Sequence, residues 1–266
     1  MVESPLNTVE VALVQARLHW QDPTSNREHL AGLMDRQPDC DLYVLPETFS
    51  TGFLGDRVDE PETMTGDTVA WMQEQAGKRS AAIAGSLAML DGDKRVNRFL
   101  FVTADGILAS YDKRHLFGFG GEGKRYHRGH SPTVVEWRGW RIDLQVCYDL
   151  RFPVWCRNDR AFDVQIFVAN WPAPRVDAWC SLLKARAIEN QSYVIGVNRT
   201  GSDGNDVQYS GRTSIFSPMG EALLELADEE TVSRVKLNIN ELRDIREKFP
   251  FLRDADEFTI SLTPDP

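Results

Sequence analysis

The sequence predicts a single α/β domain over residues 1–266, built on one mixed sheet or two packed sheets. Three observations lead to this fold class. Short apolar runs typical of strands alternate with amphipathic segments typical of helices. A length of 266 residues suits one compact domain with a large core. No internal repeat or low-complexity segment marks a boundary between domains.

The first half of the chain predicts a β-α-β-α-β order. In its first helix Leu30, Leu33 and Met34 share one face, and Thr24 or Ser25 is the expected cap. Pro46 stops the second strand. The predicted elements are a strand at 9–16, a helix at 27–37, a strand at 41–47, a helix at 66–78 and a strand at 81–90.

The second half is richer in strand. Asp105-Gly106 and Arg138-Gly139 each break an apolar segment in the manner of a short hairpin turn. A nearly continuous apolar run at 163–171 is typical of a strand covered on both faces. The predicted elements are hairpins at 98–112 and 133–147, a strand at 163–171, a helix at 176–191, and strands at 193–198, 211–217 and 231–237.

Composition and charge exclude several classes of partner. The chain has 30 basic and 40 acidic residues, a formal net charge of −10. Such a surface repels phosphate, so we expect neither nucleic acid nor an anionic membrane as a partner. No apolar run approaches the eighteen residues of a membrane span. The four cysteines form no CxxC pair and the five histidines show no zinc-site spacing, so a cytoplasmic protein is predicted.

Three reactive side chains follow predicted strands. Glu47 follows one in VLPETF, Lys113 follows another in SYDKRHLF, and Cys147 follows a third in QVCYDLRF. Each alone has an ordinary explanation, since loop charges are usually solvated and free cysteine is usually buried. Together they suit thiol chemistry: a carboxylate can take the thiol proton, and an ammonium can stabilise both the thiolate and an oxyanion.

The motifs LPETF, YDKRHLF, EGKRYHRG, VCYDLRFP, VANWPAPR and RAIENQSYV closely resemble those of the nitrilase superfamily of carbon-nitrogen hydrolases. The resemblance implies a four-layer α-β-β-α sandwich of the nitrilase type and no metal or organic cofactor. It also implies Glu47 as general base, Lys113 as oxyanion stabiliser and Cys147 as nucleophile. Glu122 matches a second glutamate that orients Lys113 in many members; a solvated carboxylate paired with Lys124 or Arg125 is the alternative.

Within the superfamily the sequence is most similar to bacterial omega-amidases. This implies release of ammonia from the terminal amide of short 2-oxo dicarboxylic acid monoamides, through a cysteine thioester. An N-carbamoyl amino acid hydrolase or a broad aliphatic amidase is the alternative within the superfamily. Two further alternatives stay open: a Cys-His thiol hydrolase with His115 or His127 as base, and a nitrilase-fold binding protein without activity.

A small anionic substrate on an acidic protein needs a local cation. Arg175, at a strand exit, and Arg151, four residues beyond the nucleophile, are the candidates. Arg151 has a structural alternative, an ion pair with Asp149 or with another carboxylate typical of the superfamily. The remaining predicted substrate contacts are the backbone N–H of Tyr148 and the side chains of Asn170 and Trp171, although Trp171 also suits a core position.

The resemblance also implies an assembly. Members of the superfamily commonly pair subunits across a two-fold interface, so a homodimer or higher homo-oligomer is expected. The predicted helix at 176–191 is the candidate interface element. The C-terminal stretch at 249–266 mixes aromatic and acidic residues, and suits either an arm on a neighbouring subunit or a surface tail.

Overall fold

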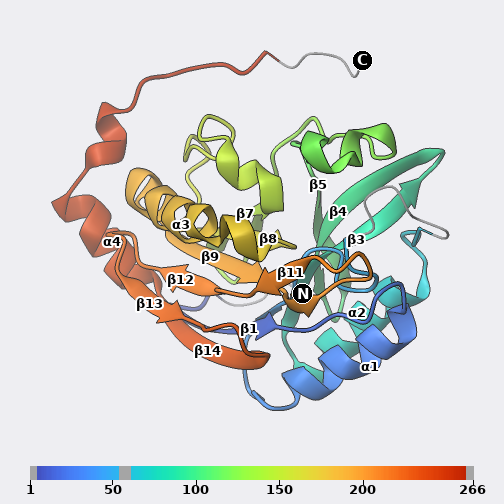
Figure 1. The fold of residues 1–266 in the computed structure, drawn as a ribbon. Helices are drawn as coiled ribbons and strands as arrows, with labels where there is room; N and C mark the ends of the chain where they lie inside the picture. The colour runs from blue at the N-terminus through green and yellow to red at the C-terminus, as the bar shows by residue number, and fades with distance from the viewer. Residues whose placement is uncertain (1–4, 54–60, 262–266) are drawn as a thin grey trace.

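The computed structural model describes residues 5–53 and 61–261. Two six-stranded sheets form its centre (Figure 1). The first sheet has the order β14-β1-β2-β3-β4-β5, and the second has the order β13-β12-β9-β8-β7-β6. The first comprises β1 (Thr8–Gln15), β2 (Leu42–Val44), β3 (Ala82–Asp91), β4 (Lys94–Thr103), β5 (Gly106–Asp112) and β14 (Thr231–Asn238). The second comprises β6 (Val134–Trp137), β7 (Trp140–Val146), β8 (Val164–Ala169), β9 (Tyr193–Asn198), β12 (Ser214–Phe216) and β13 (Ala222–Glu225).

Helices cover the outer faces of the two sheets. Helices α1 (Pro23–Met34) and α2 (Asp67–Arg79) share one apolar cluster with the first sheet. Helix α3 (Val176–Asn190) packs on β9 and β12 of the second sheet. These layers confirm the predicted α/β class and the α-β-β-α sandwich (Figure 1).

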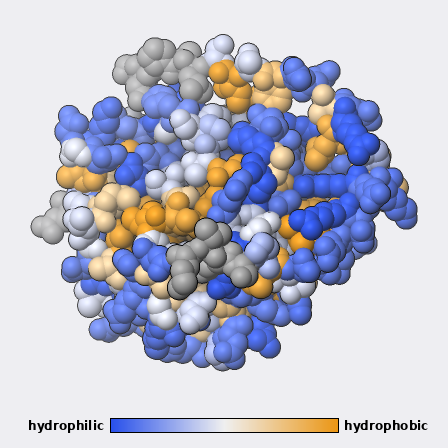
Figure 2. All heavy atoms as spheres, turned by 180° about the vertical axis from the view of Figure 1, so that it is seen from behind, coloured by the Kyte–Doolittle hydropathy of each residue, from blue (hydrophilic) through white to orange (hydrophobic). Residues whose placement is uncertain are grey.

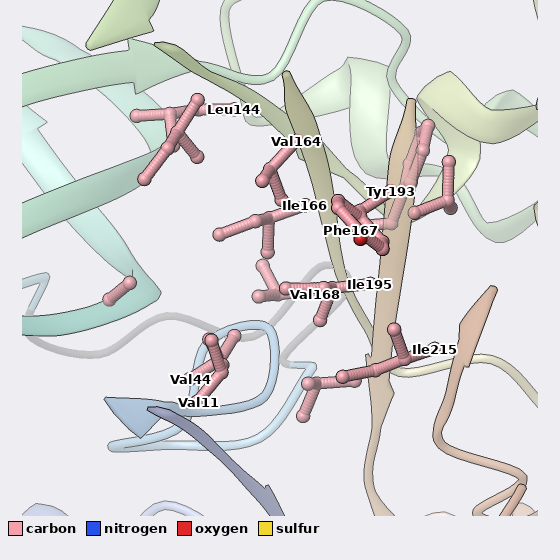
Figure 3. Packing of buried hydrophobic residues seen from close by; sticks show 14 of the residues in the cluster. Val11, Val44, Leu144, Val164, Ile166, Phe167, Val168, Tyr193, Ile195 and Ile215 are labelled. Atoms are coloured by element: carbon pink, nitrogen blue, oxygen red, sulfur yellow. The ribbon is translucent and has the colours of Figure 1, made fainter. Parts of the chain in front are cut away.

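The largest apolar cluster joins the two sheets and continues to α3 on the outer face of the second sheet. Alternate residues of a strand point to opposite faces, so Leu144, Ile166 and Val168 point toward the first sheet, which carries Val11 and Val44 (Figure 3). All five side chains are at most 1% exposed. β8 is buried along its whole length, as its continuous apolar run predicts. The face of the molecule in Figure 2 is largely hydrophilic, with hydrophobic residues gathered near its centre.

The predicted hairpins are confirmed. β4 pairs with β5 and β6 pairs with β7, both antiparallel. Arg138 and Gly139 both have positive φ, 49° and 82°, as the two central residues of a tight hairpin turn require.

The predicted cap of the first helix is wrong. Asp22 caps α1, because its carboxylate accepts a hydrogen bond from the Ser25 backbone N–H at 3.0 Å. Pro23 takes the first helical position, where its missing N–H costs nothing, so Thr24 and Ser25 lie inside the first turn.

Several elements were not predicted. Helix α4 (Ile239–Lys248) continues directly from β14, with only Ile239 and Leu242 buried, so its apolar pattern is weak. Two short strands, β10 (Thr200–Ser202) and β11 (Gln208–Ser210), form a separate hairpin, and β13 is a mostly exposed edge strand.

In the C-terminal stretch, residues 255–261 are exposed and run past the sandwich (Figure 1), with Ile260 lining a surface pocket beside Phe152 and Trp155, and 262–266 lie outside the described residues. No helix in the described ranges is long and apolar enough to cross a membrane.

Candidate active site

Glu47, Lys113 and Cys147 lie together, as their positions after three strands predict. They follow β2, β5 and β7, so both sheets contribute to the site. The Lys113 ammonium donates to Glu47 Oε1 at 2.8 Å. All three residues line one cavity of about 650 Å³.

Glu122 belongs to the same cluster. It sits on a short 3₁₀ turn, η2 (Glu122–Lys124), and its carboxylate is fully buried. Its two oxygens accept hydrogen bonds from Lys113 Nζ at 3.1 and 3.0 Å, and Oε2 also accepts from the Phe117 backbone N–H at 2.6 Å. Lys113 therefore lies between two carboxylates, and Glu122 also fixes the loop that begins at Phe117.

Electrostatics favour a permanently charged Lys113. Burial alone would lower its pKa, but the carboxylates of Glu122 and Glu47 outweigh burial and raise the pKa well above its ordinary value. Burial also raises the pKa of Glu122, an effect that Lys113 opposes. The ammonium is thus a fixed positive charge beside the thiol.

Glu47 is held in one orientation by amides. Asn97 of β4 donates to Oε1 at 2.8 Å, and the backbone N–H of Asn170 donates to Oε2 at 2.7 Å. The Asn170 side chain donates to the Glu47 carbonyl at 2.8 Å. Asn170 lines the cavity, as predicted, and it also fixes the backbone and side chain of Glu47. Asn97 was not singled out from the sequence, although asparagine is unusual inside a strand and is itself a signal.

Cys147 begins a 3₁₀ turn, η3 (Cys147–Arg151), directly after β7. Its φ of 48° is rare for a residue with a side chain and turns the chain sharply at the strand end. Burial raises the pKa of the thiol well above its ordinary value, the Glu47 carboxylate raises it further, and Lys113 opposes both. The resting group is therefore a thiol beside a carboxylate able to take its proton.

Two arginines line the cavity, each against an aromatic ring. The Arg151 guanidinium lies 4.8 Å from the centroid of Trp171, and that of Arg175 lies 5.3 Å from the centroid of Phe117. The predicted alternative for Arg151, a pair with Asp149, does not occur: the Asp149 oxygens accept from Tyr111, His115 and the Val146 N–H. Both predicted cations thus face the site.

The other predicted contacts also lie at the cavity. Tyr148 and Trp171 line it, and Trp171 is only 3% exposed, so it serves the core as well. One wall was missed from the sequence: the β10–β11 hairpin, in which Asp203 accepts hydrogen bonds from the Asn205 and Val207 N–H groups and the Tyr209 hydroxyl. The residues of this wall are Asp203, Asn205, Asp206, Val207, Gln208 and Tyr209.

The arrangement does not support a histidine base. The described residues that line the cavity include no histidine. His115 Nδ1 instead lies 2.8 Å from Asp149 Oδ1, and its ring stacks on Phe152 with centroids 3.7 Å apart. The Cys-His alternative therefore lacks the contact between thiol and imidazole that it requires.

Comparison with known proteins agrees with this geometry. A family model described as carbon-nitrogen hydrolase matches residues 10–247. The chain belongs to the carbon-nitrogen hydrolase family. The predicted resemblance to the nitrilase superfamily and to bacterial omega-amidases is confirmed by the relatives that follow.

This carbon-nitrogen hydrolase is 44% identical to Omega-amidase YafV of Escherichia coli K12, over 95% of the chain and 98% of the relative. It is 32% identical to 2-oxoglutaramate amidase of Bacillus subtilis, over 92% of the chain and 96% of the relative. The crystal structure of XC1258 from Xanthomonas campestris, a superfamily protein with an arsenic adduct in its active site, is 43% identical with a TM-score of 0.94, over 96% and 100% of the two chains. Nit3 of Saccharomyces cerevisiae, at 23% identity and a TM-score of 0.83 over 94% and 97%, shares the fold.

Proposed function

We propose that this hydrolase is an omega-amidase, which releases ammonia from the terminal amide of short 2-oxo dicarboxylic acid monoamides such as 2-oxoglutaramate and 2-oxosuccinamate. The observation that carries the proposal is a thiol at the base of a cavity that holds a carboxylate base, a buried ammonium and two arginines. The omega-amidase and 2-oxoglutaramate amidase relatives, matched over nearly their full lengths, support the substrate class.

The first half of the proposed reaction forms a thioester. Glu47 accepts the thiol proton as the Cys147 sulfur attacks the amide carbon. The resulting oxyanion is stabilised by the Lys113 ammonium and the Tyr148 backbone N–H, which lies in the first turn of η3 where amide groups lack helical partners. The carbon-nitrogen bond then breaks, and protonated Glu47 gives its proton to the leaving ammonia.

The second half hydrolyses the thioester. Glu47 takes a proton from a water molecule, and the hydroxide attacks the thioester carbon. The carbon-sulfur bond breaks, the sulfur regains a proton from Glu47, and the dicarboxylate leaves. Glu122 holds the Lys113 ammonium throughout. Each step uses only groups of this chain, the substrate and water.

The two arginines account for selection of an anionic substrate. An arginine fork can bind a carboxylate through two parallel hydrogen bonds. Arg151 and Arg175 supply positive charge at the cavity of a protein whose net charge is −10. We infer that they hold the carboxylate and 2-oxo end of the substrate while the amide end meets Cys147.

Ammonia release from 2-oxosuccinamate, compared with an N-carbamoyl amino acid and a simple aliphatic amide, tests the proposed function. We expect kcat/KM for the oxo acid to exceed that for the other two by about 100-fold, because neither competitor satisfies both arginines and the attack geometry. Equal or higher activity on either competitor would contradict the omega-amidase assignment and leave the Glu-Lys-Cys chemistry standing. Absence of any acyl adduct on Cys147 by intact-protein mass spectrometry would favour a binding protein.

We further infer a homodimer or higher homo-oligomer in the cytoplasm. Ile188 near the end of α3 is 50% exposed and lies beside Gly220, and Met219 and Leu223, within three residues of Gly220 in the sequence, are 44% and 41% exposed. Apolar side chains grouped in this way suit an interface between subunits.

The thiols of all four cysteines are free, which suits a reducing compartment such as the cytoplasm. Light scattering of wild type and Ile188→Asp, and cell fractionation, test these two inferences.

A further inference from the structure

Asp149 lies two residues beyond the nucleophile and is fully buried. Its carboxylate accepts four hydrogen bonds, two on each oxygen. Oδ1 accepts from the His115 backbone N–H at 2.9 Å and from His115 Nδ1 at 2.8 Å. Oδ2 accepts from the Tyr111 hydroxyl at 2.8 Å and from the Val146 backbone N–H at 3.0 Å. Burial with four charge-assisted hydrogen bonds makes this one of the most constrained carboxylates in the molecule.

The four donors flank the two reacting groups. Tyr111, near the end of β5, and His115, just beyond it, stand on either side of Lys113. Val146, the last residue of β7, and Asp149 itself, in η3, flank Cys147. One carboxylate therefore ties the backbone that carries the ammonium to the backbone that carries the sulfur.

We propose that Asp149 is a positioning residue that fixes the distance between the Lys113 ammonium and the Cys147 sulfur. The proposal rests on the proposed function only in taking these two groups as reaction partners, not on which amide is hydrolysed. Asp149 is not among the residues that line the cavity, so it acts through its neighbours rather than on the substrate.

The neighbours of Asp149 restrict the movement of the groups that donate hydrogen bonds to it. The Tyr111 oxygen accepts hydrogen bonds from the Arg114 N–H at 3.1 Å and from Trp155 Nε1 at 3.0 Å, which leaves its single hydrogen for Asp149. The His115 ring stacks on Phe152 at an interplanar angle of 9°, which limits its rotation. A neutral amide in place of the carboxylate would have one accepting oxygen instead of two, so two of the four hydrogen bonds would be lost.

The experiment compares Asp149→Asn with Asp143→Asn in the full-length enzyme. Both are fully buried carboxylates, Asp143 in β7 and Asp149 in η3, which follows β7 directly. Both receive the same chemical change. Asp143 accepts hydrogen bonds from Gln145, Gln165 and Arg160 and touches neither Lys113 nor the cavity, which makes it a matched control. We expect Asp149→Asn to lower kcat about 100-fold with KM within about three-fold of wild type, since small misplacements of reacting groups cost this much. Asp143→Asn should leave both constants within about two-fold.

A second measurement follows Cys147 without any substrate. The rate of its alkylation by iodoacetamide is measured against pH, with the labelled site identified by mass spectrometry. Lys113 opposes the rise in the pKa of this thiol, so moving the ammonium away shifts the alkylation profile of Asp149→Asn to higher pH. This readout stands even if the wild type releases no ammonia from 2-oxo acid amides, so failure of the proposed function and failure of the positioning role are distinguishable.

A folded Asp149→Asn variant with unchanged kcat and an unchanged alkylation profile would overturn the proposal and leave Asp149 a structural residue. If this variant does not fold, Tyr111→Phe takes its place, because it removes one of the four hydrogen bonds to Asp149 and keeps the ring, while the Arg114 N–H and Trp155 Nε1 also lose their acceptor. We expect Tyr111→Phe to lower kcat about five-fold and to shift the profile in the same direction, as loss of one such bond costs about 1 kcal/mol. No change in either readout would overturn the proposal equally.

Discussion

Two polar clusters of this protein each hold a buried carboxylate against a cation, in different surroundings. The site cluster is Glu47, Lys113 and Glu122, and the β7 cluster is Asp143, Gln145, Gln165 and Arg160. All their carboxylates are fully buried and hydrogen-bonded. The site cluster opens onto the cavity beside Cys147, whereas no member of the β7 cluster lines it. Buried charge alone therefore does not mark a site; a cavity and an adjacent reactive atom do.

The largest expected effect comes from the centre of the site cluster. Replacing Lys113 by Met keeps most of the side-chain volume but removes the ammonium, so the oxyanion loses its charged partner and the two carboxylates lose theirs. We expect kcat/KM for ammonia release to fall about 1,000-fold or more. Arg160→Met removes the cation of the β7 cluster and is the matched control, with activity within about three-fold of wild type.

Circular dichroism establishes that both variants are folded before their rates are compared. Activity retained in Lys113→Met together with its loss in His115→Ala would contradict the catalytic role of Lys113. It would instead favour the Cys-His alternative, with the histidine as base.

A smaller effect is expected at Glu122. Glu122→Gln keeps an oxygen for the Phe117 N–H but removes the charge that holds Lys113, so the ammonium loses one of its two anchors. We predict a fall in kcat of about 30-fold with little change in KM, measured by steady-state ammonia release. Glu189→Gln, which alters a partly exposed partner of Arg186 on α3, serves as control. A fall in both variants alike would mean that charge loss itself, rather than its place, causes the effect.

The next smaller effect is expected at the two arginines that line the cavity. Arg175→Met and Arg151→Met should each raise KM for 2-oxosuccinamate about ten-fold, since each removes one charged hydrogen-bond partner of the substrate. Activity on a neutral aliphatic amide, measured in parallel, should be unchanged. An equal loss on both substrates would show that the arginine supports the loops of the site and does not bind the carboxylate.

Much of the fold could be predicted from the sequence because its signals are local. The hairpin at Arg138-Gly139 and the buried strand β8 both follow from short patterns of turn and apolar residues. Helix α4 could not be predicted in this way, because only Ile239 and Leu242 are buried and the apolar pattern is correspondingly short. Asp22 was missed as a cap because three neighbouring residues, Asp22, Thr24 and Ser25, all suit that role.

Strand alternation alone would place Cys147 on the same face of β7 as Asp143 and Gln145, which would make that polar face the expected wall of a site. Those side chains instead form the covered β7 cluster beneath α3, where Asn190 bonds to Gln165. Cys147 reaches the cavity because it lies beyond the strand end with a φ of 48°. Tertiary contacts such as Asn97 to Glu47, between residues 50 apart, carry no local signal.

The smallest effect on activity is expected for Asp143→Asn, and its effect on stability is the more informative. Burial raises the pKa of Asp143 to about 6, with Arg160 and the two glutamines opposing the rise. The folded protein therefore holds a proton that the unfolded chain, with a pKa near 4 for this group, releases earlier. The contribution of this carboxyl to the free energy of unfolding is thus greatest below about pH 4 and falls as the pH rises to about 6. The amide cannot ionise, so above about pH 6 we expect the variant to be more stable than wild type by about 1–3 kcal/mol, and this advantage to vanish near pH 4.

Urea denaturation of both proteins at several pH values measures the difference, and kcat is followed in parallel. A stability gain with unchanged kcat would show that the buried charge of the β7 cluster destabilises the fold and has no role in catalysis. A pH-independent loss of stability would instead mean that the native form of Asp143 is the charged one, held by Arg160.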